Sequence, residues 1–241
     1  MEGRGNKSQA LYLTCEKYYI FELLIFAGGM MGAYTYNLRG GVFCNAQTAN
    51  VMLMSLTFGK GEWARGFYYV IPIFAYLLGT VVSEILPKPV RKLHFLRWDT
   101  WLLAIEALAV FLLGWIPLET PPQFVQVSVN FLAAMQFNTF RQAEGVPMAT
   151  TFVTNHIRQI GVWWVKHRKH HEPEALRRFQ RHTLIVAVFF AGGVVMTAFC
   201  GILREKAVWL TLIPLSVSFG ILSHADLTQE RNRLETKPRG H

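Results

Sequence analysis

Two short stretches of the sequence combine glycine with polar side chains in apolar surroundings. The first follows Arg39-Gly40-Gly41 and the second follows Gly145-Val146-Pro147. Glycine loosens a helix and proline breaks it, so each stretch predicts an extended segment followed by a short helix. The free N–H groups and the dipole at the start of such a helix suit an anionic or strongly hydrogen-bonding solute. Four polar residues are predicted to contact this solute: Thr48, Asn50, Thr154 and Asn155. The alternative, compatible with binding, is that they only cap the short helices.

Other polar residues interrupt apolar segments. Arg158 follows Thr154 by four positions and therefore shares its helix face. Its guanidinium is predicted to neutralise an anion or to pair with Glu106, in the middle of another apolar segment. A purely structural ion pair, or an arginine that extends to the membrane interface, is the alternative. Gln136 and Asn138 complete the predicted binding residues, with bridging between helices as their alternative role.

No pattern of catalytic or metal-binding residues stands out. The run from Lys166 to His171 contains three histidines, but no His-Glu-x-x-His pattern and no cysteine accompany them. This run predicts a solvated basic loop that contacts anionic lipid, rather than a metal site or a nucleic-acid site. Cys15, Cys44 and Cys200 are expected to be small buried residues. We therefore expect no enzyme activity, no metal and no cofactor.

The composition indicates a membrane protein. Of 241 residues, 52% are hydrophobic and only 16% are charged, whereas soluble domains carry about 25% charged residues. This excludes a disordered chain, a disulfide scaffold and an ordinary water-soluble enzyme. The apolar residues form blocks, several near the roughly 20 residues that a membrane-spanning helix needs. Eight segments are predicted: 18–38, 42–58, 67–86, 98–116, 124–140, 150–165, 183–203 and 207–223.

The distribution of charge predicts the topology. If segments 42–58 and 150–165 re-enter instead of crossing, most of the 24 Lys and Arg residues lie on one side, as the positive-inside rule requires. The expected fold is an all-α bundle of six spans plus two re-entrant half-helices. Its two halves, about 18–116 and 124–223, form an inverted 3+3 repeat. Segment 1–17 is then a cytoplasmic N-terminus and 224–241 a basic cytoplasmic tail.

Four stretches resemble one known family. They are Gly29–Ala33, Arg39–Asn50, Met135–Gln142 and Val146–Asn155. Over about residues 18–223 the chain resembles the YoaK-type bacterial membrane proteins, which carry the domain of unknown function 1275. The resemblance implies a multi-pass protein of the bacterial plasma membrane, with permease as the usual expectation, and supplies no catalytic residue. The sequence departs from the family at Thr48-Ala49-Asn50 and at Thr154-Asn155, where Thr-Gly-Asn and Thr-Gly are common. Gly32 replaces a frequent aspartate, so a proton-coupling role for that acid does not carry over.

The expected function is transport of a small polar or anionic solute that binds at the paired half-helix ends near the bilayer midplane. A passive channel is one alternative, since paired re-entrant segments also build pores. A non-transporting scaffold or accessory subunit is another. The expected partners are membrane lipid and an unidentified solute or ion, without nucleic acid. The sequence leaves open the substrate, the coupling ion and whether the chain forms a homo-oligomer.

Overall fold

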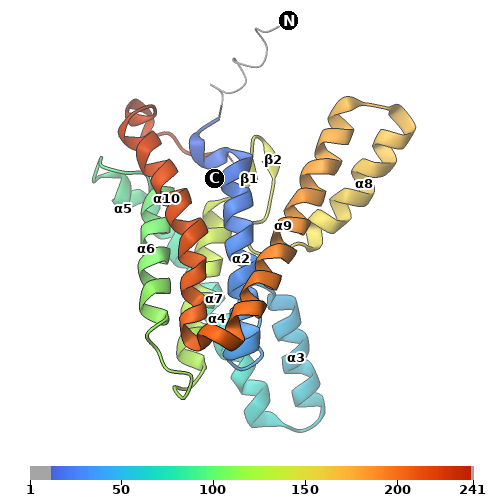
Figure 1. Ribbon diagram of the computed structural model, residues 1–241, viewed down its shortest axis with the longest axis vertical. Coiled ribbons are helices and arrows are strands. Elements are labelled where there is room, and N and C mark those ends of the chain that lie inside the picture. Colours follow the sequence, from blue (N-terminus) through green and yellow to red (C-terminus); the bar gives the residue numbers. More distant parts are fainter. Residues whose placement is uncertain (1–11, 240–241) are drawn as a thin grey trace, which may run out of the picture.

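The computed structural model describes residues 12–239, and almost all of its secondary structure is helical (Figure 1). The longer helices are α2 (Tyr18–Leu38), α3 (Gln47–Gly59), α4 (Trp63–Ile85), α6 (Trp98–Leu113), α7 (Gln123–Thr139), α8 (Thr154–His170), α9 (Pro173–Leu203) and α10 (Leu212–Leu227). The short elements are η1 (Thr14–Glu16), α5 (Pro87–Arg91), β1 (Gln142–Ala143), β2 (Val146–Pro147), η2 (Arg204–Thr211) and η3 (Arg231–Arg233). The all-α prediction is confirmed. Most of the predicted N-terminal segment 1–17 lies outside the described residues.

Helix boundaries follow the apolar segments closely at the start of the chain and less closely later. Helix α2 coincides with the predicted segment 18–38. Helix α8 continues to His170, so the basic run lies in the last turns of a helix, and the prediction of a loop was wrong. His171 ends this helix with a left-handed backbone (φ 51°), and Pro173 opens α9 ten residues before the predicted start. Proline suits the first turn of a helix because its missing N–H is not needed there.

Two pairs of long helices form the centre of the bundle. Helix α2 packs along α9, and α4 packs along α7. Glycine allows the backbones to touch: a Cβ added at Gly29 would lie 2.2 Å from the carbonyl oxygen of Phe189. One added at Gly192 would lie 2.3 Å from that of Phe26. A Cβ at Gly79 of α4 would lie 2.3 Å from the Phe131 carbonyl oxygen of α7. Each central pair therefore depends on a residue without a side chain.

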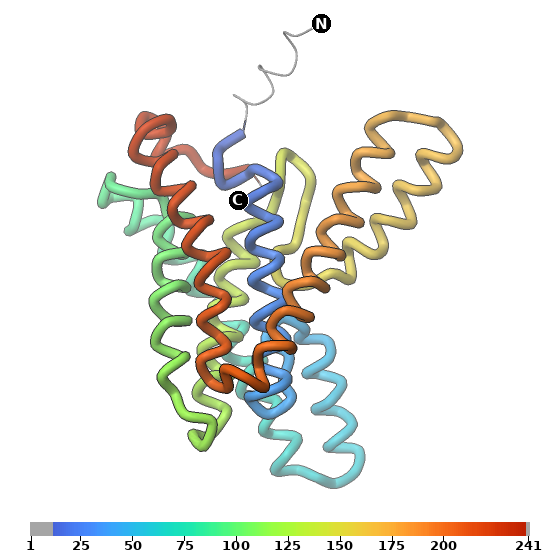
Figure 2. The backbone as a smooth tube through the Cα atoms, in the orientation of Figure 1, coloured from blue at the N-terminus to red at the C-terminus, as the bar shows by residue number. Residues whose placement is uncertain are grey.

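Helices α3 and α8 lie outside this centre. Helix α3 packs against α4, and α8 packs against α9. Figures 1 and 2 show the α3–α4 hairpin at the lower end of the molecule and the α8–α9 hairpin at the upper end. Helices α3 and α8 both start near mid-height and run toward opposite ends. We call the chain segments that precede these two helices, 39–46 and 140–153, the two breaks.

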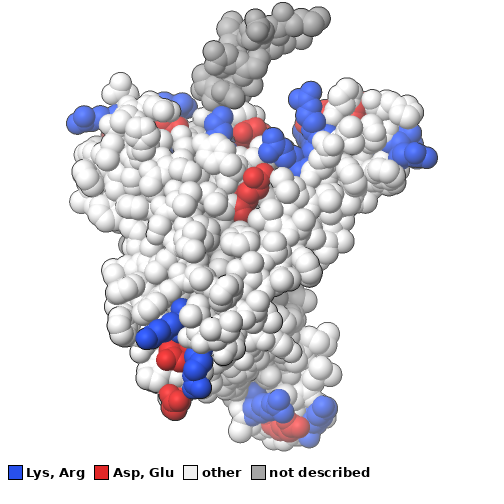
Figure 3. Space-filling model, viewed as in Figure 1, with Lys and Arg blue, Asp and Glu red and all other residues white. Residues whose placement is uncertain are grey.

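The surface between the two ends is apolar. Figure 3 shows Lys, Arg, Asp and Glu gathered toward the upper and lower ends, with a broad uncharged belt between them. Within the described part of the chain, two helical stretches are long and apolar enough to cross a membrane, Trp63–Arg91 and Pro173–Leu227. Their apolar windows are largely exposed, and large side chains such as Phe67, Phe74 and Phe190 face outward. A water-soluble protein would bury helices of this kind.

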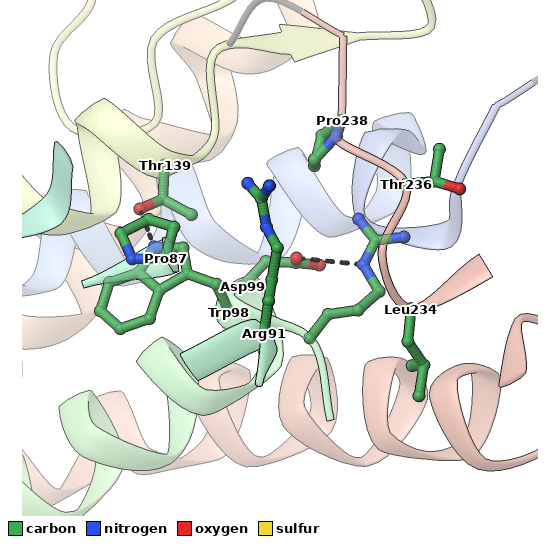
Figure 4. Close-up of a pocket in the computed structure, with 9 residues that line it drawn as sticks. Pro87, Arg91, Trp98, Asp99, Thr139, Leu234, Thr236 and Pro238 are labelled. Carbon is green, nitrogen blue, oxygen red and sulfur yellow. Dashed lines mark hydrogen bonds and ion pairs between the residues drawn. The ribbon is translucent and has the colours of Figure 1, made fainter. Parts of the chain in front are cut away.

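A buried ionic network closes the upper end of the bundle around Arg97. Its Nε lies 3.2 Å from Asp99 Oδ1 (Figure 4). Its Nη1 lies 3.4 Å from Glu230 Oε2. Glu230 also accepts hydrogen bonds from the backbone N–H and the hydroxyl of Thr14. Burial would lower the pKa of Arg97, but Asp99 and the neighbouring acids raise it above its ordinary value. The network joins η1, the start of α6 and the segment after α10.

Cys15 is part of this network, and its thiol is expected to be unreactive. Arg97 Nη2 lies 3.0 Å from Cys15 Sγ. Burial and the nearby Asp99 raise the pKa of the Cys15 thiol well above its ordinary value, and Arg97 only partly opposes them. The reactive thiolate is therefore scarce at neutral pH. Peptide-level mass spectrometry after maleimide treatment should find Cys15 modified only once the protein is denatured. An exposed cysteine introduced by Lys237→Cys serves as the positive control, and equal labelling of both in the folded protein would contradict the expectation.

Candidate functional site

The two breaks meet on one turn of α2. Asn45 Nδ2, in the first break, donates to the carbonyl oxygen of Gly28 at 3.0 Å. A Cβ at Gly28 would lie 2.6 Å from the carbonyl oxygen of Thr150, in the second break. A Cβ at Gly32, one turn along the same face, would lie 2.9 Å from Asn45 Nδ2. Both breaks therefore approach α2 where glycine leaves room, at Gly32 for the Asn45 side chain and at Gly28 for the Thr150 backbone.

Polar side chains hold the first break in its extended form. Asn50 Nδ2 donates back to the carbonyl oxygen of Phe43 at 2.8 Å, while Asn50 Oδ1 is buried without a partner among residues 12–239. Gln47 Nε2 donates to Asn130 Oδ1 of α7 at 2.8 Å. The N-cap of α3 is Ala46, without a side-chain cap, and Thr48 is exposed. Asn50 thus stabilises the break from inside, rather than as the cap of its helix.

The second break is longer and contains the β1–β2 hairpin. Gly145 turns this hairpin with a positive φ of 80°. The chain then returns through Thr150, whose hydroxyl is buried and has no partner within the described chain. The N-cap of α8 is Val153, again without a side-chain cap. Thr154 is exposed, so neither predicted threonine faces the interior.

A cavity of about 280 Å³ lies beside the second break. It is lined by Phe137, Asn138, Arg141, Pro147, Met148, Ala149, Phe152 and Asn155. The structure therefore brings together two of the predicted residues, Asn138 from α7 and Asn155 from α8. It adds Arg141, which the sequence analysis did not select as a binding residue. The available signal was its position three residues after Asn138, just beyond the end of α7.

The cavity has one aromatic and one polar side. The rings of Phe137 and Phe152 contact each other, with centroids 4.7 Å apart. On the polar side, Arg141 donates to Asn138 Oδ1 at 2.8 Å and also pairs with Glu84. The volume is near the lower limit of ordinary small-molecule sites, which begin at about 300 Å³. Amide and guanidinium donors in a space of this size suit a small solute with acceptor or anionic groups.

Arg158 and Glu106 do not meet, so the predicted ion pair between them was wrong. Arg158 is exposed on α8 and donates to Asn155 Oδ1 at 3.0 Å. Glu106 is only 1% exposed on α6, and neither carboxylate oxygen has a hydrogen-bond partner within residues 12–239. The reason lies in the packing, because α8 packs against α9 whereas α6 packs against α10. Arg158 therefore orients Asn155 from outside the cavity.

Comparison with known proteins identifies the family. The family described as "Protein of unknown function (DUF1275)" matches residues 20–221. The chain belongs to the DUF1275 family. This confirms the resemblance stated from the sequence. No curated protein and no solved structure matches the chain.

Gln136 has the helix-bridging role in this DUF1275 protein. Its side chain is fully buried on α7, and Nε2 lies 3.4 Å from the carbonyl oxygen of Leu24 on α2. Its Oε1 is buried without a partner in the described structure. Gln136 therefore does not line the cavity.

A second, smaller cavity, of about 30 Å³, lies at the upper end beside Arg91, Arg97 and Thr236 (Figure 4). It holds little more than one water molecule.

The DUF1275 chain also contains a buried histidine pair that sequence reasoning missed. His156 of α8 and His182 of α9 are 0% and 1% exposed, and their Nδ1 atoms are 2.9 Å apart. The sequence analysis considered only the histidines of the 166–171 run. A spacing of 26 residues signals a contact only when α8 and α9 are known to form a hairpin. Among residues 12–239, no three His, Cys, Asp or Glu side chains form a metal-binding group.

Proposed function

We propose that this DUF1275 protein is a transporter of the bacterial plasma membrane that moves a small polar or anionic solute. The observation that carries the proposal is the cavity of about 280 Å³ at the second break, with Asn138, Arg141 and Asn155 on its polar side. Within a bilayer, irregular backbone is tolerated only where protein covers it or where it lines a watery cavity. A break beside a cavity that presents hydrogen-bond donors is the arrangement used by broken-helix transporters.

In the proposed topology α2, α4, α6, α7, α9 and α10 cross the membrane, while α3 and α8 re-enter. Repeated packing supports an inverted repeat. Helix α2 packs on α9 as α7 packs on α4, and α3 packs on α4 as α8 packs on α9. A break follows the first helix of each half, and the helices after the breaks, α3 and α8, run toward opposite ends (Figure 1). Rocking of the two halves about their shared centre would expose the cavity to each side in turn.

The orientation follows from charge. Both ends of the described chain, α5 and the basic end of α8 lie toward the upper end in Figure 1. Lys88, Arg91 and the run Lys166–Lys169 therefore share one side. Short cytoplasmic segments collect Lys and Arg, so we assign this end to the cytoplasm. Exposed basic side chains there also suit contact with anionic lipid. The proposal assigns no catalytic residue and no cofactor.

A stability screen of the full chain in lipid nanodiscs tests the proposal. The probes are acetate, lactate, inorganic phosphate, glycine and glycerol. A solute that binds the folded state raises its melting temperature with concentration. We expect one class of probe to stabilise the parent chain, and Asn155→Ala to weaken its binding about tenfold, or about 1.4 kcal/mol. Asn232→Ala, at an exposed asparagine of η3, is the matched control and should bind as the parent does.

The outcomes separate the proposal from its alternatives. If a probe stabilises all three chains equally, its site is elsewhere and the cavity is not the binding site. If no probe class stabilises the parent, while Asn155→Ala is merely less stable, a scaffold role replaces the transporter role. Liposome uptake that saturates and shows counterflow distinguishes a transporter from a passive channel, which shows neither.

A further inference from the structure

The buried pair of His156 and His182 is arranged to share one proton. Their Nδ1 atoms are 2.9 Å apart, which is the distance of a hydrogen bond. Because both atoms are ring nitrogens, such a bond requires a proton on one Nδ1 and a lone pair on the other. Two protonated Nδ1 atoms at this distance would repel each other. The pair therefore excludes a state in which both rings are fully protonated.

The other nitrogen of His156 faces the backbone of Ala149, which offers a partner in both protonation states. His156 Nε2 lies 3.2 Å from the backbone N of Ala149 and 3.2 Å from its carbonyl oxygen. When Nε2 is unprotonated, it accepts from the Ala149 N–H. When Nε2 carries a proton, it donates to the Ala149 carbonyl oxygen. A cationic His156 thus has a partner at each nitrogen, since its Nδ1–H donates to His182.

We infer that the pair of His156 and His182 takes up one proton beyond its neutral state and that this added proton is the coupling ion of the transporter. The inference rests on the proposed function, because coupling requires a transported solute. The proton comes from water on one side, occupies Nε2 of His156, and leaves as water on the other side takes it. No oxidant, reductant or metal takes part.

Ala149 links the proton site to the cavity. Its backbone contacts His156 Nε2, and the same residue lines the cavity of about 280 Å³ together with Asn155, which directly precedes His156. Protonation exchanges an N–H donor for a carbonyl acceptor on the Ala149 backbone. In the inferred coupling, this exchange of partner shifts the part of the cavity wall that Ala149 forms. By linkage, if protonation changes the affinity for the solute by some factor, the bound solute changes the proton affinity of the pair by the same factor.

The surrounding charges limit the site to one proton. Arg178 lies one turn before His182 on α9, pairs with Glu174 at 2.9 Å and disfavours added positive charge. Arg181, also on α9, lies 3.8 Å from Glu22 of α2. On α8, the nearest cation is Arg158, which is engaged by Asn155. These cations outnumber the acids, so a second proton on the pair is unfavourable.

Ring-nitrogen NMR of the full chain tests the proton site without any solute. Histidine is labelled with ¹⁵N, and the chain in nanodiscs is titrated from about pH 8 to about pH 5, the range in which imidazoles change charge. We expect one protonation event for the pair, at His156 Nε2, with the amide and carbonyl signals of Ala149 shifting over the same pH range. His182→Gln should abolish the shared event. His170→Gln, at an exposed histidine of α8, should leave it unchanged.

Three results would overturn the inference. They are independent titration of the two rings, a pair that stays neutral down to the pH of unfolding, and protonation that leaves Ala149 unmoved. The nanodisc screen repeated at both pH limits tests coupling. In the parent and in His170→Gln, the affinity for the effective probe should differ at least about fivefold between the two pH values. In His182→Gln, the affinity should be the same at both. An equal pH effect in His182→Gln refutes coupling alone. If no probe binds any chain, the transporter proposal and the proposed coupling both fail. The NMR titration then still shows whether the pair binds a proton.

Discussion

Replacing Arg97 with methionine should lower the free energy of unfolding by about 3–5 kcal/mol, because it leaves buried carboxylates without their counter-charge. The Arg97 side chain is 2% exposed, and those of Asp99 and Glu230 are 6% and 10% exposed. Methionine fills much of the same volume, so the loss reports charge more than packing. Denaturant titration of the full chain in detergent, followed by tryptophan fluorescence, measures the effect.

An exposed ion pair provides the matched control. Arg65 and Glu62 are also 3.4 Å apart, N to O, but their side chains are 67% and 43% exposed. Water screens this pair, so Arg65→Met should change the free energy of unfolding by less than about 1 kcal/mol. The Arg97–Glu230 and Arg65–Glu62 pairs have the same N–O distance, so the different expected effects come from burial and from the second partner of Arg97, Asp99.

A compensating variant shows whether the unpaired acids cause the loss. Adding Asp99→Asn and Glu230→Gln to Arg97→Met removes the two buried charges, and should restore part of the stability. If Arg97→Met has no larger effect than Arg65→Met, the Arg97 network does not hold η1 and the chain after α10 against α6.

The sequence predicted helices well where hydropathy alone defines them. Helix α2 is a continuous apolar run between polar flanks, so its ends at Tyr18 and Leu38 follow from composition. The first ten residues of α9 include four charged residues and only three hydrophobic ones, so hydropathy cannot distinguish them from a loop. Their helical structure instead comes from pairing with α8. The two breaks were predictable because glycine and proline act locally.

The candidate site was predictable only in part. Asn138 was identified because amides are unusual within apolar segments, and Asn155 because it lies at the predicted start of the second short helix. Thr154 was selected with Asn155, but neighbouring helix positions differ by about 100° in direction, and only Asn155 faces the cavity. The failed pairing of Arg158 with Glu106 depended on which helices are neighbours. Neighbouring helices are set by tertiary packing, which neither spacing nor residue type reveals.

The close approach of α2 and α9 makes Gly192 the most size-restricted of the three glycines of α9. A Cβ there would lie 2.3 Å from the Phe26 carbonyl oxygen, and the obstacle is backbone that no rotamer change can move. Gly192→Ala must therefore push the helices apart, at an expected cost of about 1–3 kcal/mol. Thermal unfolding of the full chain in nanodiscs should show a lower melting temperature.

Gly201 lies on the same helix and provides the matched control. No atom of the described residues lies within 4 Å of a Cβ added there. Alanine also favours helix over glycine, so Gly201→Ala should be neutral or stabilising by up to about 1 kcal/mol. Glycine-to-alanine substitution on the same helix is thus expected to destabilise the protein at position 192 but not at position 201. The difference arises because, of the two, only Gly192 lies against the backbone of α2. Equal melting temperatures for the two variants would mean that α2 and α9 are not in backbone contact, and that the centre of the bundle is packed differently.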